Sequence, residues 1–269
     1  MEFRTIVSID KAPFAIEPLE PLLLVGSCFA DSIGRRFAEE RFPVTVNPYG
    51  VMYNPASVLH TVKRWLTESG APVPRIAFLT LGTNHVYRLR ETGEIVDNCQ
   101  KRPQSLFREQ TLSVGECVEF LAAAVDVLCH RRADVRVIVT VSPIRYSKYG
   151  YHGSQLSKAA LLMAADELTR RYDCVSYFPA YEIVLDELRD YRFYQPDMLH
   201  PSQQTVDYIW ERLVETCFSQ RAKQFLKDWT PVRKALSHRP FSPDSDEYRQ
   251  FLADARRREQ ELIDRYGEN

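Results

Sequence analysis

Short apolar runs rich in branched side chains recur along the chain, separated by stretches of mixed polarity. Runs of this kind, apolar throughout rather than alternating with polar residues, are typical of parallel strands buried on both faces of a sheet. They predict five strands, at residues 22–27 (LLLVGS), 44–46 (VTV), 76–82 (IAFLTLG), 135–142 (VRVIVTVS) and 174–178 (CVSYF).

Amphipathic segments with apolar residues at helical spacing lie next to most of these runs. They predict helices within 31–42, 55–69, 113–133, 154–172 and 202–226. Alternation of strands and helices predicts a doubly wound α/β fold.

Two parts of the chain depart from this alternation. Residues 83–112 have a Thr-Gly turn between short extended pieces, which predicts an inserted hairpin and loop over one end of the sheet. Residues 229–269 end in a charged segment that predicts a terminal helix. We therefore expect an α/β domain over 1–228 and a helical extension over 229–269.

Composition narrows the class of protein. The 269 residues are 45% hydrophobic and 26% charged, with a net charge of −1, which is ordinary for a globular protein and argues against nucleic-acid binding. The N-terminus has no apolar core of signal-peptide length and no run approaches a membrane span, so a cytoplasmic protein with no membrane partner is expected. The six cysteines form no C-x-x-C pair, so we expect them to be mostly buried free thiols. The six histidines form no H-x-x-x-H motif, so we expect no metal site, and no cofactor is expected either.

Polar residues follow each predicted strand, where open α/β sheets bind their ligands. They should converge at one edge of the sheet. The residues concerned are Gly26 and Ser27, Asn47 and Gly50, Gly82 and Asn84, Ser142 and Arg145, and Asp197 and His200.

These residue types suit hydrolytic acyl transfer. A serine hydroxyl needs a histidine to remove its proton, and the histidine needs an acceptor on its other ring nitrogen. Ser27 is the expected nucleophile, with His200 as base and Asp197, three residues earlier, as its partner. Donors to the oxyanion are expected from the backbone N–H groups of Ser27 and Gly50 and from the Asn84 amide.

The order Ser–Gly–Asn–His, with an aspartate three residues before the histidine, resembles the SGNH (GDSL-type) hydrolase superfamily. The string GSCFA at 26–30 resembles the signature of its GSCFA family, as do blocks such as TVSPIRY, SKAALL and DELRDYRFYQPDMLHPS. The resemblance covers about residues 3–215. It implies a three-layer α/β/α, flavodoxin-like fold whose five-stranded parallel sheet has the order 2-1-3-4-5. Where this chain has LGTNH, related sequences often read LGTAW, and many have histidine at the positions of Gln100 and Tyr146.

Several residues keep a second interpretation. Ser27 also suits a helix cap, and Cys28 beside it is a second nucleophile, which we expect to point into the core as a packed thiol. Asn84 is either an oxyanion donor or a loop-shaping residue, with Asn98 as its competitor.

The substrate-facing candidates are less specific. Asn47 before Pro48 also suits a turn, and Arg145 suits either an anionic substrate group or a nearby carboxylate. With Asn98, Gln100 and Tyr146 they complete the residues expected to face substrate.

Three functions compete. The first is an esterase that removes a small acyl group, such as acetyl, from a hydroxylated metabolite or sugar, or takes it from an acyl carrier. The second is an acyltransferase built on the same triad, and the third is a binding or scaffold module that retains the fold. The sequence leaves the oligomeric state open.

Overall fold

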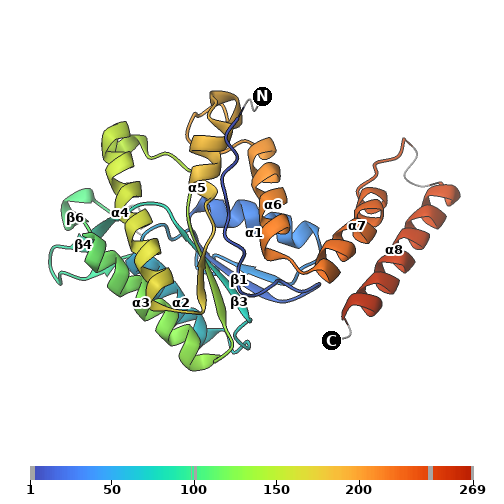
Figure 1. Cartoon of the computed structure of the whole chain (residues 1–269), viewed down its shortest axis with the longest axis horizontal. Helices are drawn as coiled ribbons and strands as arrows, with labels where there is room; N and C mark the ends of the chain where they lie inside the picture. Colours follow the sequence, from blue (N-terminus) through green and yellow to red (C-terminus); the bar gives the residue numbers. More distant parts are fainter. Residues whose placement is uncertain (1–3, 98, 100–101, 242–244, 268–269) are drawn as a thin grey trace.

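A parallel sheet lies at the centre of the molecule (Figure 1). The computed structural model describes residues 4–97, 99, 102–241 and 245–267. The five strands run in the order β2-β1-β3-β7-β8, which is the expected 2-1-3-4-5 order, and all four pairings are parallel. Their bounds are Leu22–Gly26 (β1), Val44–Val46 (β2), Ile76–Leu81 (β3), Arg136–Val141 (β7) and Val175–Tyr177 (β8).

Helices cover both faces of the sheet, so the predicted three-layer α/β/α fold is confirmed. The bounds are Cys28–Glu39 (α1), Pro55–Glu68 (α2), Val114–Arg131 (α3), Gly150–Arg171 (α4), Ala180–Glu182 (α5), Gln203–Cys217 (α6), Gln220–Leu236 (α7) and Asp246–Gly267 (α8). No helix in the described ranges combines the length and apolar character needed to cross a bilayer.

Two apolar cores lie on opposite faces of the sheet. Leu23, Val25 and Leu79 pack with residues of α2, α3 and α4, whereas Leu24 and Phe78 pack with residues of α1 and α6. The alternation follows from strand geometry, because successive side chains point to opposite faces. Both faces are buried, so both sets of residues are apolar, which is why the strands were recognisable as continuous runs.

The inserted hairpin is larger than predicted. β4 (His85–Leu89) pairs antiparallel with β5 (Ile95–Val96) and also with β6 (Phe107–Thr111), giving a three-stranded sheet beside the main one. The third strand follows a short 3₁₀ turn at Gln104–Leu106.

The helix expected over 202–226 is two helices. α6 ends at Cys217, and Ser219 caps α7 by accepting a hydrogen bond from the Ala222 N–H. Between them, the extended Phe218 bridges to Ile16 of the N-terminal segment. This tertiary pairing interrupts an amphipathic pattern that looked continuous in the sequence.

The C-terminal extension consists of α8 packed against α7, to one side of the sheet (Figure 1). α7 runs without a break across residue 229, where the extension was expected to begin. It is fixed to α1, because Trp229 Nε1 donates to the carbonyl of Glu39 and Arg233 pairs with the buried Glu40 carboxylate at 2.8 Å.

Candidate active site

The turn from β1 to α1 is shaped by close backbone contact with β3. Gly26 has a φ of 145°, and a Cβ at this position would lie 2.0 Å from the carbonyl oxygen of Thr80. Glycine is required there because any side chain would collide with β3. Ser27 follows as the N-cap of α1, in extended conformation.

Ser27 points into the protein, contrary to the expected orientation. The residue is 0% exposed, and its Oγ lies 3.1 Å from Thr80 Oγ1 and accepts the Phe29 N–H at 3.3 Å. These contacts are those of a helix cap tied to the neighbouring strand. In this arrangement the hydroxyl is not presented to solvent or to a substrate.

Cys28, by contrast, is only half-buried. The Cys28 thiolate would raise the pKa values of Tyr53 and Tyr146 by charge repulsion. The thiol therefore lies near these two tyrosines, which follow β2 and β7. Partial burial, followed by the charge of Asp31, raises the pKa of Cys28, while its own backbone N–H lowers it. Cys28 packs against the core on the α1 side of the sheet, as expected of a packed thiol, but it keeps partial solvent exposure, because the chain turns at Gly26 so that Ser27 takes the fully buried position.

Asp197 and His200 form the expected pair, in a tight turn rather than on a helix. His200 Nδ1 lies 2.6 Å from Asp197 Oδ2, and Asp197 Oδ1 accepts the backbone N–H groups of Leu199 and His200 at 2.8 and 3.0 Å. These bonds, with the His200 backbone N–H contributing most, lower the pKa of Asp197 to about 2. The carboxylate fixes the tautomer with hydrogen on Nδ1, which leaves Nε2 free to accept a proton.

The turn carrying His200 packs against the segment that follows β7. The Arg145 N–H donates to the carbonyl of Leu199 at 3.0 Å, and Arg145 Nη1 donates to the carbonyl of Met198 at 2.9 Å. The pair thus lies at the carboxyl edge of the sheet, as does the start of α1. Within the described chain, however, no hydrogen bond joins the imidazole to Ser27 or Cys28.

The three expected oxyanion donors are all engaged inside the protein. The Ser27 N–H is shared between Thr80 O at 3.0 Å and Thr80 Oγ1 at 2.9 Å, and the Gly50 N–H donates to Asn47 O at 2.8 Å. Asn84 is buried, and its Nδ2 donates to the carbonyl of Leu112 at 2.6 Å. The structure therefore does not assemble the predicted oxyanion hole, because the strand-end turns use these groups to satisfy their own backbone.

The contacts of Asn84 fit the loop-shaping interpretation. We expect Asn84→Ala to lower the free energy of unfolding by about 1–3 kcal/mol, since the Leu112 carbonyl loses its donor. The value of kcat should change by less than about threefold, whereas loss of an oxyanion donor would cost about 10²-fold or more. Chemical denaturation and ester kinetics on the same preparation separate the two. A large fall in kcat with unchanged stability would return Asn84 to the oxyanion hole.

Asn47 and Tyr146, the remaining candidates that the structure describes in this group, are engaged in contacts within the protein. Asn47 Oδ1 accepts the Gly26 N–H at 2.8 Å and its Nδ2 donates to Asp31 at 2.7 Å, so this side chain holds the turn around β1. Tyr146 stands over Gly82, where an added Cβ would lie 2.4 Å from its hydroxyl. Asn98 and Gln100 lie outside the described residues.

Lys158 was missed by the sequence interpretation. It is 2% exposed, and its Nζ donates to the carbonyls of Gly82 at 2.7 Å and Ser142 at 2.6 Å. Burial lowers its pKa to about 7. By linking the ends of β3 and β7, Lys158 fixes two of the turns that border the site. The sequence contained a signal for this residue, because helical spacing places Lys158 on the same face of α4 as Ser154, Leu161 and Ala165, and that face is buried.

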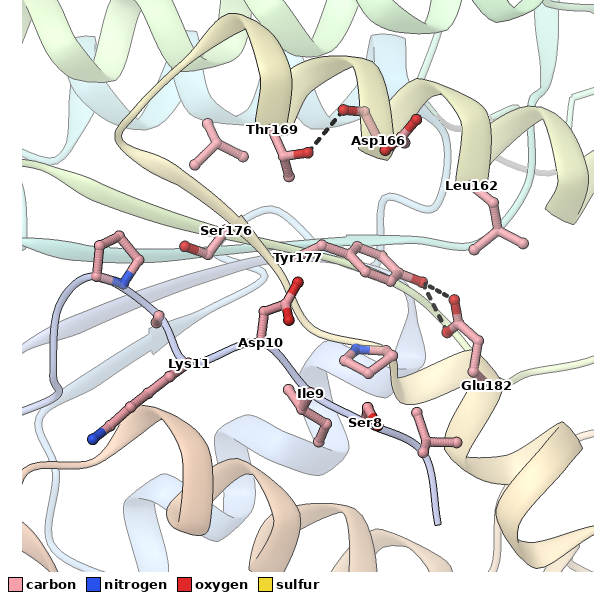
Figure 2. A pocket seen from close by; sticks show the side chains of 15 residues that line it. Ser8, Ile9, Asp10, Lys11, Leu162, Asp166, Thr169, Ser176, Tyr177 and Glu182 are labelled. Carbon is pink, nitrogen blue, oxygen red and sulfur yellow. Dashed lines mark hydrogen bonds between the residues drawn. The ribbon is translucent and has the colours of Figure 1, made fainter. Parts of the chain in front are cut away.

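Two pockets are lined by residues that follow the strands of the parallel sheet, near the candidate site residues. Another pocket lies away from the candidate site. A pocket of about 490 Å³ is lined by Tyr53, Tyr87 and Lys148, and one of about 260 Å³ includes Arg145. The third, of about 590 Å³, opens at the edge strand β8 between α4 and the N-terminal segment (Figure 2). There the Tyr177 hydroxyl lies 2.9 Å from both oxygens of the Glu182 carboxylate. No group of three or more metal-ligating side chains occurs among the described residues.

The chain belongs to the GSCFA family. The family's profile matches residues 21–75 and 69–213, and the profile of the GSCFA domain protein C-terminal domain matches residues 229–268. The resemblance stated from the sequence is thus confirmed. No curated protein matches the chain.

Solved structures of similar fold are distant in sequence. A member of the lipolytic protein G-D-S-L family from Veillonella parvula is 12% identical, with 72% of this chain and 96% of that chain covered and a TM-score of 0.49. A GDSL-like lipase from Bacteroides thetaiotaomicron is 12% identical, with 78% and 88% covered and a TM-score of 0.47. A carbohydrate esterase family 3 protein from Talaromyces cellulolyticus is 12% identical, with 78% and 99% covered and a TM-score of 0.44. At this identity the similarities concern the fold alone.

Proposed function

We propose that the protein hydrolyses a small acyl ester, such as an acetyl ester of a hydroxylated metabolite or sugar, through an acyl-enzyme. The observation that carries this proposal is the Asp197–His200 pair, with 2.6 Å between Oδ2 and Nδ1, at the sheet edge where α1 begins. A histidine held in this tautomer and partly open to solvent is suited to general base catalysis. Its partner carboxylate remains ionised because three donors converge on it.

The attacking atom in this proposal is Cys28 Sγ rather than Ser27 Oγ. Ser27 would have to break its contacts with Thr80 and Phe29 and turn outward before it could react. Cys28 makes no such cap contact, and it is only partly buried. Its raised pKa leaves a protonated thiol at neutral pH, so attack requires a base, and His200 supplies one.

The reaction then has two balanced steps. His200 Nε2 accepts the thiol proton as Sγ bonds to the ester carbonyl carbon, and the C–O bond breaks while that proton passes to the departing alcohol. A water molecule next attacks the thioester, its proton going to His200, and the C–S bond breaks to release the carboxylic acid and regenerate the thiol. The Cys28 backbone N–H lies beside the sulfur at the N-terminus of α1, where developing negative charge is favoured.

Turnover of 4-nitrophenyl acetate tests this proposal. The native protein should release 4-nitrophenolate catalytically, and His200→Ala should lower kcat by about 10²–10⁴-fold through loss of the base. His130→Ala, at an exposed position on α3, is the matched control and should retain native activity. If the native protein turns over no short acyl ester, or if His200→Ala is as active as the control, the catalytic proposal fails and a binding module is favoured. Faster alcohol release on addition of sugar or alcohol acceptors would instead identify a transferase.

A further inference from the structure

A small pocket beside the His200 turn contains two arginines and two tyrosines. This tyrosine–arginine pocket, defined by Arg145, Arg189, Tyr191 and Tyr194, has a volume of about 260 Å³. Tyr194 bridges to Pro201, the residue after His200, and Arg145 is bonded to the carbonyls of Met198 and Leu199. The pocket therefore shares a wall with the turn that holds the proposed base.

Neither guanidinium is neutralised by a carboxylate in the described part of the chain. Arg145 donates only to a backbone carbonyl, and Arg189 enters no ion pair there. Asp190 also lines the pocket, but its carboxylate is already bonded to Arg192 at 2.9 Å. The pocket consequently presents two positive charges with little compensation.

Surrounding contacts hold the Arg145 guanidinium and the backbone of Arg189 in place. The Arg145 Cζ lies 4.2 Å from the ring centroid of Tyr151, 5.4 Å from that of Tyr194 and 5.8 Å from that of Tyr191. Contact of this kind on the face of a guanidinium leaves its N–H edge available to a planar anion. Arg189 follows the π-helix Ile183–Leu188, with a φ of 44° and its N–H bonded to the Val184 carbonyl, so its backbone is held in the left-handed region.

From these contacts we infer that the tyrosine–arginine pocket binds an anionic group of the substrate, a carboxylate or a phosphate, next to the ester that is cleaved. Its size suits such a group with a few attached carbons, and arginine is the side chain that binds both anions through paired hydrogen bonds. The inference rests on the proposed function for its catalytic consequence: the enzyme should prefer acidic esters. Anion binding itself does not require turnover.

A matched pair of esters tests the preference. Mono(4-nitrophenyl) succinate carries a carboxylate where 4-nitrophenyl butyrate carries a methyl group. The native protein should show a kcat/KM at least about tenfold higher for the succinate, because charge-assisted hydrogen bonds are made only with the acid. Arg189→Gln should lose about tenfold of this ratio. Arg257→Gln, at an exposed arginine of α8 that pairs with Asp254, is the control and should keep the native ratio.

Calorimetry separates this inference from the proposed function and distinguishes the two anions. Inorganic phosphate and succinate are titrated separately into the native protein and into Arg189→Gln. Saturable binding of either anion that is lost in the variant supports the site even if no ester is turned over, and the tighter anion identifies the substrate's acidic group. The inference is overturned if neither anion binds saturably, or if active native protein and Arg189→Gln have the same ester ratio.

Discussion

Replacement of Cys28 by alanine is expected to abolish ester turnover, with kcat/KM falling by at least about 10⁴-fold, because the atom that forms the acyl-enzyme is removed. Ser27→Ala should retain at least a tenth of native activity. It should instead lower the free energy of unfolding by about 0.5–2 kcal/mol, since α1 loses its cap and the contact with Thr80. Ester kinetics and urea denaturation on the three proteins measure both effects.

Chemical labelling supplies a control that does not depend on substrate choice. Iodoacetamide should inactivate native protein and Ser27→Ala at similar rates, while the residual activity of Cys28→Ser should be insensitive to it. Cys117 and Cys217 should react slowly in all three, because burial raises the pKa of these thiols to about 12 and about 11. Full activity in Cys28→Ala together with inactive Ser27→Ala would restore the serine assignment.

The second large effect is expected at Asp197. Asp197→Asn should lower kcat by about 10³–10⁴-fold, because an amide at this position no longer enforces the tautomer with hydrogen on Nδ1. Circular dichroism should show a folded protein, since the exposed turn is also held by the Gln195 and Arg145 backbone bonds to His200 and Leu199. Asp254→Asn, a carboxylate of α8 bonded to Arg257, is the matched control and should remain active. An Asp197→Asn variant with native kcat would remove the carboxylate from the mechanism.

The same pair has a consequence for pH dependence. The pKa of Asp197 is lowered to about 2 in the folded protein, so the stability that this carboxylate contributes is present above its ordinary value of 3.8 and is lost as pH falls from there towards 2. Asp197 consequently stays ionised at all pH values above its ordinary pKa of 3.8. Any acidic limb of the rate profile above pH 4 must therefore come from another group.

The fold could be predicted because its determinants are repeated along the chain. The bounds of every strand of the parallel sheet agree within one residue with those of a predicted run, since both faces of the sheet are covered and the runs are dominated by branched apolar residues. The break between α6 and α7 was not predictable, because it depends on Phe218 pairing with Ile16, some two hundred residues away in the sequence.

The sequence predicted which residues gather at the candidate site better than it predicted how their side chains are oriented. The D-x-x-H spacing correctly brings Asp197 and His200 together, because a carboxylate can bond a ring nitrogen three residues on within one tight turn. Which of Ser27 and Cys28 faces outward depends on the backbone angle of Gly26 and the closeness of Thr80, which no local pattern encodes. The same limit applies to Asn84, whose amide is taken by the Leu112 carbonyl contributed from the end of β6.

The most direct measurement is the location of the acyl group on the enzyme. Native protein is mixed with excess 4-nitrophenyl acetate, quenched in acid during the first turnovers, digested and sequenced by fragmentation mass spectrometry. We predict an acetyl group on Cys28 Sγ that neutral hydroxylamine removes, as expected for a thioester, and that does not form in Cys28→Ala. An acetyl group on Ser27 Oγ, or turnover with no acetyl group on either residue, would contradict it.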